Sequence, residues 1–226
     1  MSDRAASSDG GAALARGTAS QLARGRVCYA VGMKRFRRVA VYCASSSDID
    51  PVYVEAARDF GTLLVERGYG LVFGGGRVGL MGVVADAVVA AGGETIGVIP
   101  HKLRDLEVAH RGLTELLVVD SMHARKTVMA SMSDAFVALP GGFGTLDEIF
   151  EVTTWNQLGY HSKPAGLLNV KGYFDALATF ITHAADEGFV RPVHRDLLLV
   201  DSDARRLLDR LEVAELPDLK KWIDRP

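Results

Sequence analysis

The chain has 226 residues, of which 48% are hydrophobic and 24% charged, and its formal net charge is −2. This composition is ordinary for a globular protein in water, and the small net charge argues against binding to nucleic acid or to an anionic membrane surface. The longest apolar runs are shorter than the ~20 residues that a membrane-spanning helix needs. We therefore expect neither nucleic acid nor a membrane as a partner.

The cysteines and histidines exclude two further classes of protein. Cys28 and Cys43 are too few for a disulfide framework or a cysteine metal site, and the six histidines lack metal-ligand spacing. The apolar stretch 27–33 is too short for the core of a signal peptide. We expect a cytoplasmic protein that binds no metal.

Residues 1–36 are rich in Ala, Gly, Ser and Arg and show no sustained hydrophobic period, which predicts a disordered tail. From residue 37 onward, apolar β-branched runs alternate with helix-length segments. The expected strands are 38–45, 70–75, 95–100, 134–140 and 164–170. The expected helices are 52–67, 80–91, 122–132, 145–158, 173–187 and 203–213. This alternation predicts a single α/β domain over residues 37–226, with a Rossmann-like, doubly wound parallel sheet.

Ligands of such sheets bind beyond the carboxyl ends of the strands, so the turns that follow the strands matter most. The first turn, "CASSSD" at 43–48, offers hydroxyl groups for a phosphate or sugar, or merely a serine-rich helix cap. Both interpretations stay open.

The second turn, "GGGRVGLMG" at 74–82, formally matches the dinucleotide fingerprint G-x-G-x-x-G. That fingerprint also requires an acid at the end of the next strand, whereas Glu94 precedes its strand. We interpret the turn as an anion-binding loop rather than an NAD site. A tight turn that packs a helix against a strand remains the alternative.

The third turn follows the strand 134–139 in "LPGGFGTLDEIFE" and leads into a helix expected to start at Thr145. Amide groups at a helix N-terminus face outward and attract anions. A helix end contributes only about 0.3–1 kcal/mol, whereas micromolar-to-millimolar affinity requires about 4–8 kcal/mol. Cationic side chains should therefore assist, and Arg77, Arg125 and Lys126 are the candidates. By spacing alone, Arg125 and Lys126 could equally form a solvated first helical turn.

A simpler interpretation of the acids after this turn also exists. Thr145 and Glu148 have the spacing of a capping box, in which the glutamate bonds the backbone amide of the threonine.

Together, "GGGRVGLMG", "MHARK" and "PGGFGTLDE" resemble the LONELY GUY family of cytokinin-activating phosphoribohydrolases, often labelled putative lysine decarboxylases. The resemblance extends over about residues 37–213, and the family signature P-G-G-x-G-T-x-x-E is met in full at 140–148. It implies hydrolysis of the N-glycosidic bond of adenosine 5′-monophosphates, N6-modified or plain, without a cofactor and by a homodimer. Arg125 and Glu148 match the family's catalytic pair. The matched substrate-binding positions are Glu107, Arg125, Lys126, Gly141, Gly142, Phe143, Gly144, Thr145, Leu146, Asp147, Glu148 and Thr154.

Alternatives from other classes remain open at this point. A non-catalytic nucleotide-binding module would keep the phosphate-binding turn but release no base. A pyridoxal-phosphate decarboxylase would need a lysine for a Schiff base, and Lys126 and Lys163 are the candidates.

Overall fold

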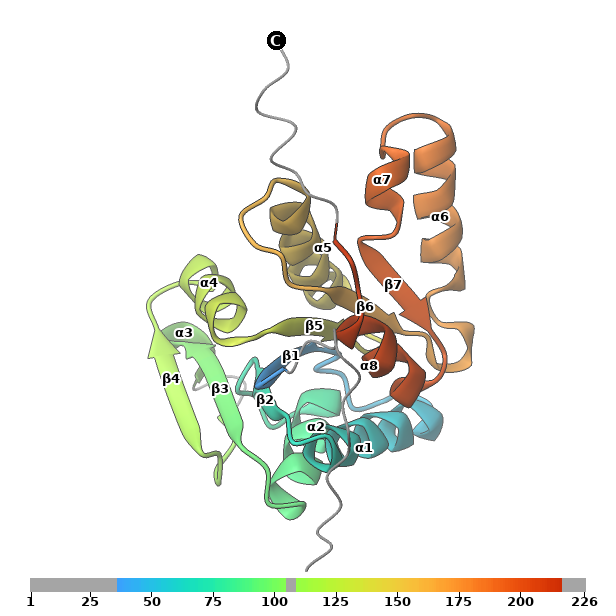
Figure 1. The fold of residues 1–226 in the computed structure, drawn as a ribbon. Helices are drawn as coiled ribbons and strands as arrows, with labels where there is room; N and C mark the ends of the chain where they lie inside the picture. The colour runs from blue at the N-terminus through green and yellow to red at the C-terminus, as the bar shows by residue number, and fades with distance from the viewer. Residues whose placement is uncertain (1–35, 105–108, 217–226) are drawn as a thin grey trace, which may run out of the picture. The chain divides into compact units, whose positions relative to one another are not determined.

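The computed structural model describes residues 36–104 and 109–216, all within the compact unit Gly32–Pro226. Seven parallel strands form one sheet in the order β4-β3-β2-β1-β5-β6-β7 (Figure 1). The strands are β1 (Arg38–Tyr42), β2 (Gly70–Phe73), β3 (Thr95–Pro100), β4 (Glu115–Val119), β5 (Ala135–Ala138), β6 (Ala165–Leu168) and β7 (Leu198–Asp201). The helices are α1 (Pro51–Glu66), α2 (Gly79–Ala90), α3 (His101–Arg104), α4 (Met122–Met132), α5 (Phe143–Gln157), η1 (Val170–Gly172), α6 (Asp175–Asp186), α7 (Pro192–Arg195) and α8 (Ala204–Glu212).

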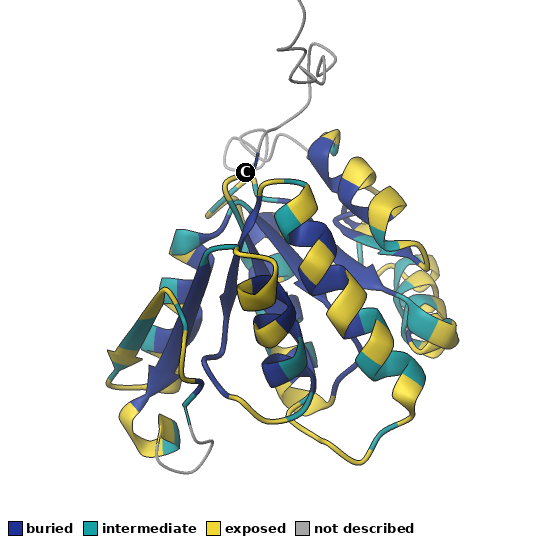
Figure 2. Cartoon of the chain, turned by 90° about the horizontal axis from the view of Figure 1, so that it is seen from below, coloured by how far each residue is buried: buried dark blue, intermediate teal, exposed yellow. Residues whose placement is uncertain are grey.

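Helices cover both faces of the sheet, as Figure 1 shows, and two apolar clusters result. Side chains alternate between the faces of a strand, so Val39 and Val41 of β1 pack toward α1, α2 and α8. Tyr42 of the same strand packs toward α4 and α5. The central strands are buried on both faces, and exposed residues lie on the outer sides of the helices (Figure 2). The sheet is therefore doubly wound, which confirms the predicted fold class.

The sequence analysis missed the two edge strands, β4 and β7. β4 is an edge strand, and its residues are exposed or only partly buried, unlike those of the central strands. β7 is the opposite edge strand, and two of its four residues are only partly buried. The five expected strands are all present, and most expected boundaries lie within three residues of those observed.

Residues 1–35 of the predicted tail lie outside the described residues, so the boundary at residue 36 stays a prediction. Phe36 itself is buried against the cluster beneath α1 and α2. Among the described helices, none combines the length and apolar character required to cross a membrane.

Candidate active site

The chain reverses its direction of winding between β1 and β5, because β1 pairs with β2 on one side and with β5 on the other. Such a switch point opens a crevice beyond the carboxyl ends of the two strands. The turns after them are joined directly, since the amide of Ala44 donates to the carbonyl of Pro140 at 3.2 Å. The candidate site begins at this crevice.

The turn after β5 leads into α5, which starts at Phe143 with Gly142 as its N-cap. The helix therefore begins two residues earlier than expected, and Thr145 is its third residue. The capping-box interpretation is wrong for this reason, since Thr145 does not occupy the capping position. Gly142 has no side chain that could bond the first amides of the helix, so these amides suit an anion.

Gly142 and Gly144 border open space on this turn. A Cβ atom added to either would have no described neighbour within 4 Å, apart from its own chain neighbours and helix backbone. Phe143, between them, is 94% exposed. The start of α5 is therefore accessible to a ligand.

Gly141 has the opposite surroundings. A Cβ at Gly141 would overlap the hydroxyl of the buried Thr145 and lie 3.0 Å from the amide of Ala44. Its carbonyl accepts a hydrogen bond of 2.8 Å from the hydroxyl of Tyr173, a contact that the sequence analysis did not identify. Contacts on both sides of Gly141 thus hold this part of the turn in place, next to the open positions at Gly142 and Gly144.

Arg125 lies in the first turn of α4, which Ser121 caps by accepting from the amide of Ala124 at 3.1 Å. Its guanidinium is buried, with Nη2 4.0 Å from Oε1 of Glu148 on α5. The Nε atom is also buried and has no hydrogen-bond partner among the residues that the structure describes. A solvated helical turn is therefore the wrong interpretation of Arg125, and the same holds for the buried Lys126.

The charge of Glu148 acts on residues at the end of β1. The Glu148 side chain is 12% exposed. Burial, followed by the negative charge of Glu148, raises the pKa of Tyr42 well above its usual range. The same two causes raise the pKa of the Cys43 thiol. Arg125 and Glu148 thus lie together near the end of β1. Their role as a catalytic pair stays a prediction.

Lys126 points from α4 to two other acids of α5. Its ammonium forms ion pairs of 3.1 Å with Asp147 and with Glu151. Burial disfavours the charged form, but these carboxylates outweigh it and raise the pKa of Lys126. The predicted substrate contacts of Lys126 and Asp147 thus involve groups that already bind each other.

The other predicted positions divide into two groups. Phe143, Leu146, Asp147 and Thr154 line a shallow surface groove of about 600 Å³ along α5. Glu107 lies outside the described residues. Their assignment as substrate contacts stays a prediction.

The turn after β2 is packed against protein, unlike the tip of the β5 turn. Gly79 has a φ of +65°, and a Cβ there would lie 2.5 Å from the carbonyl carbon of Ser45. The amide of Leu80 in α2 donates to Ala44 at 2.9 Å. These contacts favour the packing interpretation over an independent anion loop.

Glu94 lies directly before β3, at the amino ends of the strands and so opposite the crevice. Its carboxylate binds the guanidinium of Arg38 through two hydrogen bonds of 2.7 Å. These bonds lower the pKa of Glu94. Glu94 therefore cannot serve as the ribose acid of a dinucleotide site. This agrees with the sequence analysis, which did not expect an NAD site.

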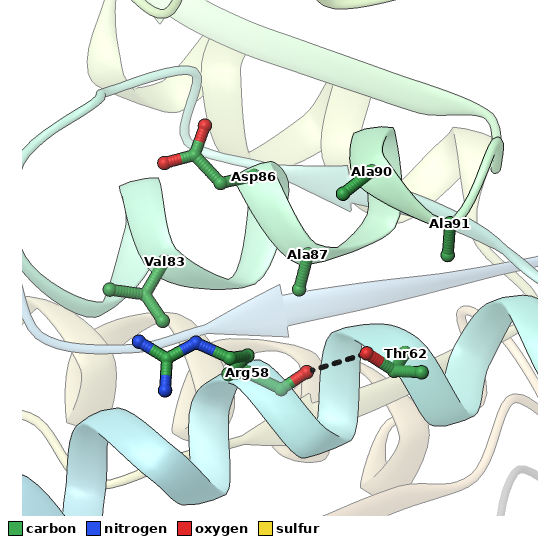
Figure 3. Close-up of a pocket in the computed structure, with 7 residues that line it drawn as sticks. All are labelled: Arg58, Thr62, Val83, Asp86, Ala87, Ala90 and Ala91. Atoms are coloured by element: carbon green, nitrogen blue, oxygen red, sulfur yellow. Dashed lines mark hydrogen bonds between the residues drawn. The ribbon is translucent and has the colours of Figure 1, made fainter.

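A further groove of about 590 Å³ lies between α1 and α2, on the other face of the sheet from α4 and α5 (Figure 3). Val83 and Ala87 face Arg58 across it, while the hydroxyl of Thr62 bonds the Arg58 carbonyl at 3.2 Å. This groove is therefore separate from the candidate active site. In residues 36–104 and 109–216, no cluster of three or more acids, histidines or cysteines could hold a metal ion.

The sheet and its turns define a Rossmann-like α/β protein in which the N-terminus of α5, without a side-chain cap, lies at the switch point. A family model described as "possible lysine decarboxylase" matches residues 81–211. The cytokinin riboside 5′-monophosphate phosphoribohydrolase LOG7 of Arabidopsis thaliana is 50% identical over 181 residues, covering 80% of this chain and 83% of that protein. The probable phosphoribohydrolase LOGL9 of Oryza sativa subsp. japonica is 52% identical over 182 residues, or 80% of each chain. The chain belongs to the LONELY GUY family of phosphoribohydrolases, which confirms the resemblance of its motifs.

Solved structures with lower identity support the fold alone. The molybdenum cofactor carrier protein from Chlamydomonas reinhardtii superposes with a TM-score of 0.58 at 24% identity. The match covers 76% of this chain and 98% of the carrier protein.

Proposed function

We propose that this protein hydrolyses the N-glycosidic bond of adenosine 5′-monophosphates, plain or N6-modified, and releases the base and ribose 5-phosphate. The observation that carries the proposal is the buried Arg125–Glu148 pair, at 4.0 Å, beside an uncapped helix N-terminus. The names of the relatives from Arabidopsis and rice support the same reaction.

The start of α5 and Arg125 together would bind the 5′-phosphate. The helix end alone contributes about 0.3–1 kcal/mol, which is too little for a nucleotide. A guanidinium adds charge-assisted hydrogen bonds, each about twice as strong as a neutral one. The unpartnered Nε of Arg125 supplies one donor that is already desolvated.

Glu148 would act on the ribose. Cleavage of a glycosidic bond builds positive charge at C1′, and a carboxylate beside it stabilises the transition state more than the ground state. The same carboxylate can accept a proton from the attacking water as the bond from C1′ to the base breaks. Binding the phosphate fixes the ribose relative to Glu148, which lowers the barrier by removing motional freedom beforehand.

The label "possible lysine decarboxylase" suggests pyridoxal phosphate, and the lysines of the site do not fit that cofactor. A Schiff-base lysine must be available as a neutral amine, whereas two carboxylates keep Lys126 charged. Burial lowers the pKa of Lys163, which by itself favours the neutral amine. However, Lys163 lies just before β6, at the amino ends of the strands and so opposite the crevice, where its Nζ donates to the carbonyl of Ala130 at 2.7 Å.

We also propose that the protein is a cytoplasmic homodimer. The exposed Phe143 and the partly exposed Phe150 and Trp155 give α5 an apolar surface beside the site, which a second copy would cover. Size-exclusion chromatography with light scattering should report twice the mass of the chain, and a monomer mass would contradict this part of the proposal.

The reaction is tested by chromatography after incubation with AMP and with isopentenyladenosine monophosphate. Free base and ribose 5-phosphate are the expected products, and the dephosphorylated nucleosides should react with a kcat/KM at least ~10²-fold lower. Nucleotide binding without release of base would instead indicate a non-catalytic module. Equal reaction of nucleosides and nucleotides would contradict the role given to the start of α5.

A further inference from the structure

Gly74 lies directly after β2, where the guanidinium of Arg125 passes across it. A Cβ atom at Gly74 would overlap Nη2 of Arg125 and lie 3.0 Å from Cζ. It would also lie 3.2 Å from the sulfur of Met81. The absence of a side chain at Gly74 therefore makes room for the arginine.

The other contacts of the Arg125 guanidinium are long. Nη1 lies 4.0 Å from the sulfur of Met122, and Nη2 lies 4.0 Å from Oε1 of Glu148. Neither distance corresponds to a strong hydrogen bond. The shape of the surrounding surface, rather than a tight hydrogen bond, thus determines where the guanidinium lies.

We infer that Gly74 is a positioning residue for the proposed reaction: it sets the direction in which Arg125 reaches toward the phosphate and Glu148. This inference rests on the proposed function. It gives the glycine turn after β2 a role in the site, although that turn does not itself present an open anion-binding surface.

A methyl group at Gly74 should displace the arginine more readily than the strand. The overlapping atom is the end of a flexible side chain, and Gly74 is not among the glycines with positive φ. Gly74→Ala should therefore fold normally while its guanidinium is misplaced. Gly61→Ala is the matched control, because its Cβ would lie 2.7 Å from the Val84 carbonyl, between α1 and α2.

The experiment is a double-mutant cycle of Gly74→Ala with Arg125→Ala, with release of base from AMP as the readout. Arg125→Ala should lower kcat/KM by roughly 10²-fold through loss of a charge-assisted phosphate contact. Gly74→Ala should lower it by at least ~10-fold, yet add less than about twofold when Arg125 is already alanine. Gly61→Ala should lower the melting temperature and leave kcat/KM within about twofold of the parent.

Binding of ribose 5-phosphate, measured by calorimetry in the same four proteins of the cycle, should show the same pattern. Equal losses from Gly74→Ala in both backgrounds, or unchanged kinetics, would overturn the inference. Absence of base release from the parent protein would instead contradict the proposed function. The binding cycle then still tests whether Gly74 positions Arg125.

Discussion

The glycine-rich turns after β2 and β5 look alike in the sequence but have different surroundings. In the β2 turn, Gly74 makes room for an arginine and Gly79 for the backbone of the β1 turn. At the tip of the β5 turn, Gly142 and Gly144 face open space. A glycine indicates that something approaches the backbone closely, but only the fold shows whether that is protein or ligand. The β2 turn shapes the site from within the protein, whereas the tip of the β5 turn is exposed to a ligand.

The largest expected effect tests whether Glu148, which follows the open β5 turn, takes part in the reaction. Glu148→Gln removes the negative charge but keeps the shape, so kcat should fall by about 10³-fold while nucleotide binding persists. The melting temperature should stay within a few degrees of the parent. A melting curve, a binding isotherm and base release on one preparation measure all three.

Glu151→Gln is the matched control for this prediction. It lies one turn further along α5 and contacts Lys126, so kcat should change by less than about threefold. Near-normal turnover of Glu148→Gln would mean that the carboxylate serves the fold alone.

A substitution in the β2 turn, which is packed against protein, should instead change the free energy of unfolding. Gly79→Ala places a side chain at a φ of +65° and 2.5 Å from the backbone of Ser45. Backbone strain and the clash together should lower the free energy of unfolding by about 3 kcal/mol, or roughly 10 °C in melting temperature. Urea denaturation measures this loss. A stable Gly79→Ala variant would show that the β2 turn is looser than its contacts indicate.

The smallest effect is expected at the open turn. Gly144→Ala lies in the first turn of α5, where alanine favours the helix by about 0.5–1 kcal/mol, so the melting temperature should stay the same or rise slightly. The new methyl group would stand where the phosphate approaches, and KM for AMP should rise about 10-fold, equivalent to about 1.4 kcal/mol. An unchanged KM in steady-state assays would mean that the phosphate binds elsewhere.

The central sheet was predictable because its strands are buried on both faces and therefore form continuous apolar runs. The position of the β5 turn followed from its glycines and from the strand before it. The start of α5 did not, because a glycine N-cap leaves no side-chain signature and the Thr145–Glu148 spacing imitates a cap. The burial of Arg125 was equally hidden, since it depends on Gly74, a residue 51 positions earlier that tertiary packing brings beneath it.

Lys126 adjoins Arg125 on α4, and Asp147 adjoins Glu148 on α5. The Lys126–Asp147 ion pair is therefore a second link between the same two helices, beside the contact between Arg125 and Glu148. Because folding raises the pKa of Lys126 above its usual 10.5, the stability that its charge contributes is fully present below pH 10.5 and is lost only above it. The link between α4 and α5 should thus persist on the alkaline side of the pH range of an ordinary assay. A decline in rate between pH 7 and 10 would then report the reacting groups rather than a loosening of the two helices.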